Sequence, residues 1–348
     1  KNMCGIIGYL GKNNALSILL DGLKRLEYRG YDSAGVAIQN NGNVAAVKAV
    51  GKIKELEKKI AGKNIAGKLG IAHTRWATHG KPSEANAHPH TDCAGKIWLV
   101  HNGIIENYQP LKKHLESRGH KFKSETDTEV LAHLIEDLYN GNLTKTLQKV
   151  LKLLKGAYGL VVFHSREPDK IVAAKYGSPL IVGLSAGETI IASDVSAVIR
   201  YTKQVIYLDD GEIAEINGNG FKIFNSESEK INKTVCAIEW NIEQAEKQGF
   251  AHFMLKVIFE QPEAIANSMR GRFIIDEGRA KLGGLESANK RIQEIKKLII
   301  VSCGTSYHTG LIAKNMLEEY VELQTEVVYA GEFRYRKNLL DKNTAVLA

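Results

Sequence analysis

The chain has 348 residues, a formal net charge of +8 and 44% hydrophobic residues. This length exceeds the size at which one hydrophobic core stops growing, so we expect two domains. The positive charge is spread along the chain, without a long run of like charges or a basic segment interleaved with aromatic residues, which argues against a nucleic-acid-binding protein. No stretch resembles a secretory signal or a membrane-spanning segment, which argues against a membrane protein.

The four cysteines are scattered through the chain, without the spacing that is typical of metal ligands. We therefore expect free thiols, a reducing compartment and a cytoplasmic location. These cysteines are Cys4, Cys93, Cys236 and Cys303.

In the first two thirds of the chain, short apolar strands alternate with amphipathic helices. Such an order predicts two stacked sheets covered by helices. Strands are expected at Cys4–Leu10, Ala34–Ile38, Val44–Val50, Leu69–His73 and Ile97–His101, and in much of 158–224; helices are expected from Asn13 or Asn14 to about Leu26, and at about 108–118, 128–140 and 143–155.

The composition changes after about Asn225, and we interpret 225–250 as a connector. Helices are then expected at about 253–270 and 287–295. The strand Lys297–Val301 is followed by a helix, and a second strand at Glu326–Ala330 by another. This order is typical of the opening of a doubly wound α/β domain.

Cys4 would be the first residue if a start methionine at Met3 were removed. The thiol and the free α-amino group of such a cysteine form a nucleophile and a base on one residue, because an α-amino group is partly unprotonated near neutral pH. The alternative is a small buried residue that opens a strand.

Polar residues gather after the expected strand that ends at His73, in HTRWATHG (73–80) and NAHPH (86–90). The planar fork of Arg75 suits a carboxylate, and Trp76 could exclude water from a site. The histidines raise the question of zinc, but a proline and a glycine interrupt their spacing, so we expect no metal.

Asn102 and Gly103 follow another apolar strand, and an Asn side chain beside a Gly N–H can offer two donors to an oxyanion. An ordinary Asn-Gly turn is the alternative. Asp127 could bind a substrate ammonium group or simply cap the next helix. The stretch 303–306 (CGTS) lies between a strand and a helix, which is a common place for an anion.

Together, MCGI at the start, YRGYDSAG (28–35), HTRWATHG, NAHPH, HNGIIEN (101–107) and SETDTE (124–129) closely resemble the glutaminase domain of the glutamine–fructose-6-phosphate aminotransferase (isomerizing) family, the glucosamine-6-phosphate synthases. FEQP (259–262), SCGTSYHTG (302–310) and GEFRYRK (331–337) resemble the start of its sugar-isomerase domain. The motifs occur in the order of the family.

The resemblance implies a four-layer αββα N-terminal-nucleophile glutaminase domain at 4–224, a linker at 225–250, and an incomplete doubly wound sugar-isomerase (SIS) domain at 251–348. It also implies glutamine and fructose 6-phosphate as substrates, no metal or organic cofactor, and a homodimer in the full-length enzyme. Cys4 would attack glutamine, with its α-amino group as base. Further implied roles are the oxyanion donors Asn102 and Gly103; the glutamine-binding residues Arg75, Asp127, Thr78, His79 and Arg29; the gate Trp76; and the sugar-phosphate contacts Thr305 and Ser306.

Two departures from the family limit the expected activity. Lys1 and Asn2 precede Met3, so the nitrogen of Cys4 is an amide and no base in the chain as printed. The chain also stops at Ala348, so we expect it to complete only the glutaminase half-reaction. Alternatives are another class II amidotransferase, such as an amidophosphoribosyltransferase, or a non-catalytic sensor of glutamine or a sugar phosphate.

Overall fold

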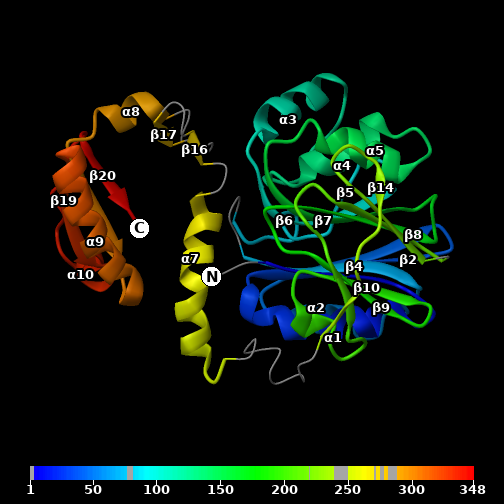
Figure 1. Cartoon of the computed structure of the whole chain (residues 1–348). Helices are drawn as coiled ribbons and strands as arrows, with labels where there is room; N and C mark the ends of the chain where they lie inside the picture. The colour runs from blue at the N-terminus through cyan, green and yellow to red at the C-terminus, as the bar shows by residue number, and fades with distance from the viewer. Residues whose placement is uncertain are drawn as a thin grey trace. The chain divides into compact units, whose positions relative to one another are not determined.

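The computed structural model describes residues 4–76, 81–218, 220–238, 250–269, 272–274, 278–280 and 288–348. The chain divides into two compact units, Lys1–Ala280 and Lys281–Ala348 (Figure 1). We describe each unit by itself.

The first sheet of unit 1 has eight strands in the order β15-β11-β9-β10-β1-β4-β2-β3, and its neighbouring strands are antiparallel. Near its middle, β1 places Gly5 opposite Thr74 of β4 and Ile7 opposite Ala192 of β10. The strands are β1 (Gly5–Leu10), β2 (Ser33–Asn40), β3 (Asn43–Val50), β4 (Leu69–Arg75), β9 (Ile181–Ser185), β10 (Glu188–Ala192), β11 (Gln204–Tyr207) and β15 (Cys236–Ala237).

The second sheet has seven strands in the order β14-β13-β12-β8-β7-β6-β5, again with antiparallel neighbours. Its strands are β5 (His90–Thr91), β6 (Ile97–Ile105), β7 (Gly156–His164), β8 (Lys170–Tyr176), β12 (Ile213–Asn217), β13 (Gly220–Phe224) and β14 (Lys230–Ile231). Two of the sheet strands, β14 and β15, lie in the stretch that we interpreted as a connector. The domain limits stay a prediction.

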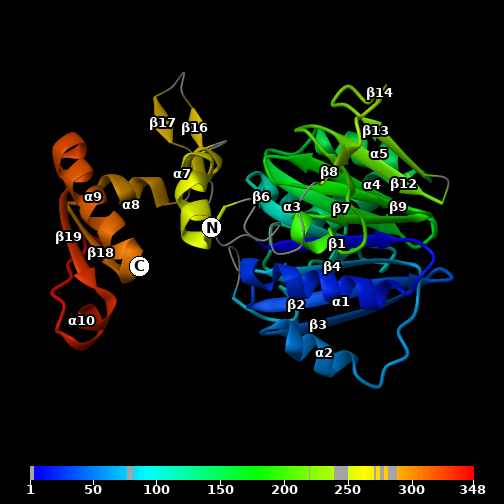
Figure 2. The same cartoon turned by 60° about the horizontal axis from the view of Figure 1, so that its bottom comes forward.

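The two sheets stack face to face and helices cover both outer faces, as Figures 1 and 2 show. Helices α1 (Ala15–Leu26) and α2 (Ile53–Ile60) cover the first sheet, and α3 (Tyr108–Ser117), α4 (Glu129–Leu138) and α5 (Leu143–Leu151) cover the second. Three apolar cores fill the three spaces between these layers. The predicted four-layer αββα fold is confirmed.

Local sequence explains several of these elements. Asn41 and Gly42 both have positive φ angles, 49° and 82°, as the two-residue turn between β2 and β3 requires. Asn14 accepts a hydrogen bond from the N–H of Leu16 and so caps α1. Helix α2 was not predicted, although its three buried residues, Ile53, Leu56 and Ile60, have helical spacing and its other five residues are charged.

The two units differ in how their strands pair. In unit 2 the order is β19-β18-β20 and both pairs are parallel, as a doubly wound domain requires. Its elements are α8 (Asn289–Gln293), β18 (Lys297–Ser302), α9 (Gly304–Val321), β19 (Gln324–Tyr329), α10 (Ala330–Tyr335) and β20 (Thr344–Leu347).

The remaining described elements of unit 1 are short, apart from one helix. They are the 3-10 helices at Glu27–Arg29 and Val195–Ala197, the helix α7 (Phe253–Met269) and the strands β16 (Phe273–Ile274) and β17 (Arg279–Ala280). Among the residues that the structure describes, no helix combines the length and the apolar character needed to cross a membrane.

Phe163 lies fully buried in the core between the two sheets. We expect Phe163→Ala to lower the free energy of unfolding by about 3–5 kcal/mol, because it removes a large apolar side chain and leaves a cavity. Denaturant unfolding measures this loss. Tyr207→Ala is the control, because Tyr207 is 44% exposed, and an equal loss in both variants would contradict the layered core.

Candidate active site

Cys4 lies directly before β1, and its sulfur faces the end of β4. The N–H of Trp76 donates a hydrogen bond to Cys4 Sγ at 3.1 Å, and Trp76 O lies 3.5 Å from the same sulfur. Burial raises the pKa of Cys4 to about 11. The sulfur is therefore a neutral thiol near neutral pH, and it needs a base before it can act as a nucleophile.

Asn102 is held between Cys4 and a buried histidine. Its Nδ2 donates to Cys4 O at 2.8 Å, and its Oδ1 lies 3.0 Å from His73 Nε2 on β4. Burial lowers the pKa of His73 to about 3, so the ring is neutral near neutral pH. A neutral ring with its proton on Nε2 donates to Asn102 Oδ1 and turns the amide nitrogen toward Cys4.

Asn102 and Gly103 lie inside β6, which continues to Ile105. The alternative prediction, an Asn-Gly turn at the end of the strand, is therefore wrong. Gly103 has a φ angle of 131°, and a Cβ atom at this position would lie only 2.0 Å from Ala157 O of β7. Only glycine fits such a place. The sequence pattern missed this extension because the polar Asn102 interrupts the apolar run.

Arg75 is a buried residue at the end of β4, directly before Trp76. The YRGYDSAG stretch supports this strand end. A Cβ atom on Gly30 would lie 2.7 Å from the carbonyl carbon of Arg75, and the N–H of Asp32 donates to Arg75 O at 3.2 Å. The ring of Tyr31 packs edge-on against Trp76, with 5.2 Å between centroids.

Asp127 is buried beside β6, where its Oδ2 accepts a hydrogen bond from the N–H of Ile105 at 2.7 Å. The N-cap residue of α4 is Thr128, whose hydroxyl lies 2.9 Å from His101 Nδ1. The carboxylate of Asp127 is thus tied to the strand that carries Asn102. Its predicted role in glutamine binding stays a prediction.

Arg29 has contacts that the sequence did not reveal. Its guanidinium donates to Ser193 O at 2.8 Å and to Ser193 Oγ at 3.2 Å, and it lies 3.5 Å from Asp194 Oδ2. Ser193 Oγ in turn accepts from the N–H of Ile6, two residues after Cys4. Arg29 therefore anchors the start of β1, and its role in the pocket stays a prediction.

The remaining predicted site residues fall in other places. Thr78 and His79 lie outside the described residues. Thr305 and Ser306 lie in unit 2, exposed in the first turn of α9, as predicted for a helix that begins directly after a strand. Their contact with a sugar phosphate stays a prediction.

The described histidines of HTRWATHG and NAHPH form a buried layer. The rings of His73 and His88 stack with 4.0 Å between centroids, and His90 packs edge-on against His88 at 4.7 Å. Burial lowers the pKa of His88 and of His90. These rings are therefore neutral near neutral pH, and they pack beneath the site.

A second polar cluster, which the sequence analysis missed, lies on the outer side of the second sheet. It consists of Cys93, His120, His133 and Glu136. The residues come from three separate segments, and only the i, i+3 spacing of His133 and Glu136 on α4 could have drawn attention to it.

Comparisons with known proteins agree with this architecture. Residues 46–248 match a family described as glutamine amidotransferase domain, and residues 291–348 match one described as SIS domain. The chain is 50% identical over 333 residues to a protein of Aquifex aeolicus (strain VF5) named glutamine–fructose-6-phosphate aminotransferase (isomerizing); the alignment covers 96% of this chain and 55% of that protein. A Clostridium acetobutylicum protein of the same name is 47% identical over 345 residues, which cover 99% of this chain and 57% of that protein. The chain thus spans about half the length of these curated relatives.

Two solved structures resemble the chain over most of its length. The glutamine phosphoribosylpyrophosphate amidotransferase of B. subtilis, complexed with ADP and GMP, matches with a TM-score of 0.57 and 25% identity, over 93% of this chain and 65% of that one. A structure titled as the allosteric regulatory enzyme of purine biosynthesis shares the fold, with a TM-score of 0.60 and 23% identity, over 94% of this chain and 80% of that one.

The buried histidine layer makes stability depend on pH. Because burial lowers the pKa of His88 below its ordinary value of 6.5, the unfolded chain takes up a proton below that pH that the folded chain does not. We expect the thermal unfolding midpoint to fall with the pH below 6.5, and His88→Gln to reduce this slope. His114→Gln, at an exposed position, should leave it unchanged; equal slopes in the two variants would contradict the prediction.

Proposed function

The chain belongs to the family of glutamine amidotransferase domains, and from that premise we propose that it releases ammonia from glutamine through a thioester on Cys4. The observation that carries the proposal is the surrounding of Cys4: the N–H of Trp76 donates to its sulfur, and an Asn102 amide fixed by His73 donates to its carbonyl oxygen. A nucleophile beside fixed donors is the arrangement that acyl transfer requires.

In a chain that starts at Cys4, the α-amino group of Cys4 is free. The reaction begins when the proton of the Cys4 thiol passes through water to this amino group. The thiolate attacks the side-chain amide carbon of glutamine, and the negative charge moves to the amide oxygen. When the C–N bond breaks, the proton goes to the leaving nitrogen and ammonia departs. Water then cleaves the thioester and gives glutamate and the free thiol.

Asn102 and Gly103 stabilise the oxyanion in this mechanism. One N–H of the Asn102 amide stays bonded to Cys4 O, and the other donates to the substrate oxygen, while the N–H of Gly103 supplies the second donor to that oxygen. The glutamine-binding residues are Arg75, Asp127, Thr78, His79 and Arg29. Arg75 pairs with the α-carboxylate and Asp127 with the α-ammonium group, and Trp76 gates the departing ammonia.

In a longer protein of this kind, ammonia passes to fructose 6-phosphate and yields glucosamine 6-phosphate. The relatives' names and the SIS match at 291–348 support this acceptor over a phosphoribosyl one. Thr305 and Ser306 hold the sugar phosphate at the start of α9. The long form is a homodimer, works in the cytoplasm and uses no cofactor, nucleic acid or membrane.

The state of the Cys4 nitrogen should decide the activity. We expect a chain that starts at Cys4 to hydrolyse glutamine at least about 10²-fold faster than one that retains Lys1–Met3, because an amide nitrogen cannot serve as the general base. Glutamate release by the two forms, with intact masses, measures the difference. Cys236→Ser in the Cys4-start form should keep the activity. A folded Cys4-start form that binds glutamine without turnover would instead support a sensor.

Removal of the Asn102 amide should slow the chemical step. In the Cys4-start form we expect Asn102→Ala to lower kcat for glutamine hydrolysis about 10²–10³-fold, with a smaller effect on KM, because one oxyanion donor is lost. Asn225→Ala, in a surface turn, is the matched control. An unchanged kcat in a folded Asn102→Ala variant would refute the assigned role.

A further inference from the structure

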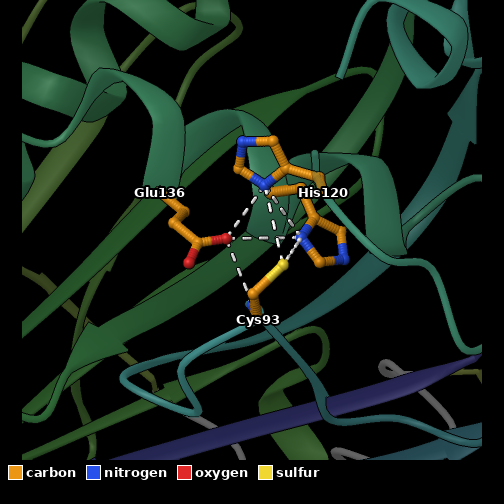
Figure 3. Close-up of side chains that lie close together, drawn as sticks. Cys93, His120 and Glu136 are labelled. Atoms are coloured by element: carbon orange, nitrogen blue, oxygen red, sulfur yellow. Dashed lines mark hydrogen bonds and ion pairs between the residues drawn. The ribbon is translucent and has the colours of Figure 1, made fainter. Parts of the chain in front are cut away.

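We propose that Cys93, His120, His133 and Glu136 form a structural zinc-binding site, separate from the candidate active site. One donor atom of each residue lies within 4.8 Å of the donor atoms of the others. Figure 3 shows Cys93, His120 and Glu136 pointing toward one another. We name these four residues the outer cluster.

Five donor–donor distances within the outer cluster, 3.0–3.8 Å, lie close to the edges of a tetrahedron around zinc. The two Nδ1 atoms of His120 and His133 are 3.4 Å apart, and they lie 3.0 and 3.4 Å from Glu136 Oε2. Cys93 Sγ lies 3.8 Å from His120 Nδ1 and 3.5 Å from His133 Nδ1. Donors about 2.0–2.3 Å from a tetrahedral Zn²⁺ would be roughly 3.3–3.7 Å apart.

In both histidines Nδ1 points into the outer cluster, and Nε2, on the far side of the ring, lies near a carboxylate. His120 Nε2 lies 3.6 Å from Asp137 Oδ1, and His133 Nε2 lies 3.6 Å from Glu129 Oε1. The charge of these carboxylates favours the proton on Nε2, which leaves the Nδ1 lone pair for a metal; both distances exceed hydrogen-bond range, and His133 Nε2 has no hydrogen-bond partner. Two inward-facing lone pairs, a carboxylate and a sulfur then converge on one point, and a cation satisfies all four.

The donor set selects the metal. A thiolate and two imidazoles favour Zn²⁺ over Mg²⁺ or Ca²⁺, which take oxygen ligands. Four protein donors fill a tetrahedral shell, so the site is structural and leaves no position for a substrate. Cys93 is exposed and Glu136 is half-buried, which gives the ion a path of entry.

The position of the outer cluster shows what zinc would join. Cys93 lies in the turn between β5 and β6, His120 follows α3, and the other two ligands lie on α4. The N–H of Lys121 donates to Cys93 Sγ at 3.5 Å, and the N–H of Cys93 donates to Glu136 Oε2 at 3.2 Å. Zinc would therefore cross-link three segments, which include the loop that leads to Asp127.

The test uses the full chain, stripped with a chelator and then incubated with zinc chloride or cobalt chloride. We expect about one zinc per chain after dialysis, by elemental analysis, and for cobalt the visible bands of tetrahedral Co²⁺ with a thiolate-to-metal band. Cys93→Ser and His120→Gln should lose the zinc. Cys236→Ser, which removes an exposed thiol elsewhere, should retain it.

Asp137→Asn provides a graded test of the orienting carboxylates, with an expected loss of zinc affinity of about 10–100-fold. Zinc should also raise the thermal unfolding midpoint of the unaltered chain and leave that of Cys93→Ser unchanged.

If the ligand variants do not fold, the cobalt spectrum of the unaltered chain decides whether the site binds metal. Absence of bound zinc, an octahedral cobalt spectrum, or zinc retained in Cys93→Ser would overturn the proposal.

Discussion

The hydrogen bond between His73 and Asn102 is the contact on which the candidate site depends, because it joins the two sheets at the place where Cys4 lies. His73 belongs to β4 of the first sheet and Asn102 to β6 of the second. The Asn102 amide keeps its orientation because His73 Nε2 donates to Asn102 Oδ1, and burial keeps the ring neutral by lowering the pKa of His73. Burial between the two sheets therefore determines the protonation state of His73, the donor in the His73–Asn102 pair.

Helix α4 connects the two polar sites of unit 1. Its N-terminal end follows Asp127, whose carboxylate is bound to β6, and its last turns carry two members of the outer cluster. Glu129 links the two ends, since it accepts hydrogen bonds from the N–H groups of Lys123 and Ser124 and also faces His133. The loop before Asp127 is thus held by these polar contacts and by the packing of Phe122 against the core.

Much of this arrangement could be predicted from the sequence, and the parts that could not be predicted have a physical cause in common. The apolar runs of β1, β4 and β7 and the Asn41-Gly42 turn are strong local signals, so the layers followed from them. Cys4 stood out because it follows Met3, and Arg75 and Asn102 stood out because their polar groups follow apolar strands. The pairing of His73 with Asn102, the anchoring of Arg29 on Ser193 and the outer cluster depend on contacts between residues distant in sequence, which no periodicity records.

The position of β1 inside the first sheet has a consequence for synthesis of the chain. One neighbour, β4, ends at residue 75, but the other, β10, spans Glu188–Ala192. At a translation rate of about 5–20 residues per second, the strand that follows Cys4 lacks its second partner for roughly 10–40 seconds. During that interval β1 can pair only with β4, so the edge of β1 that later binds β10 stays open.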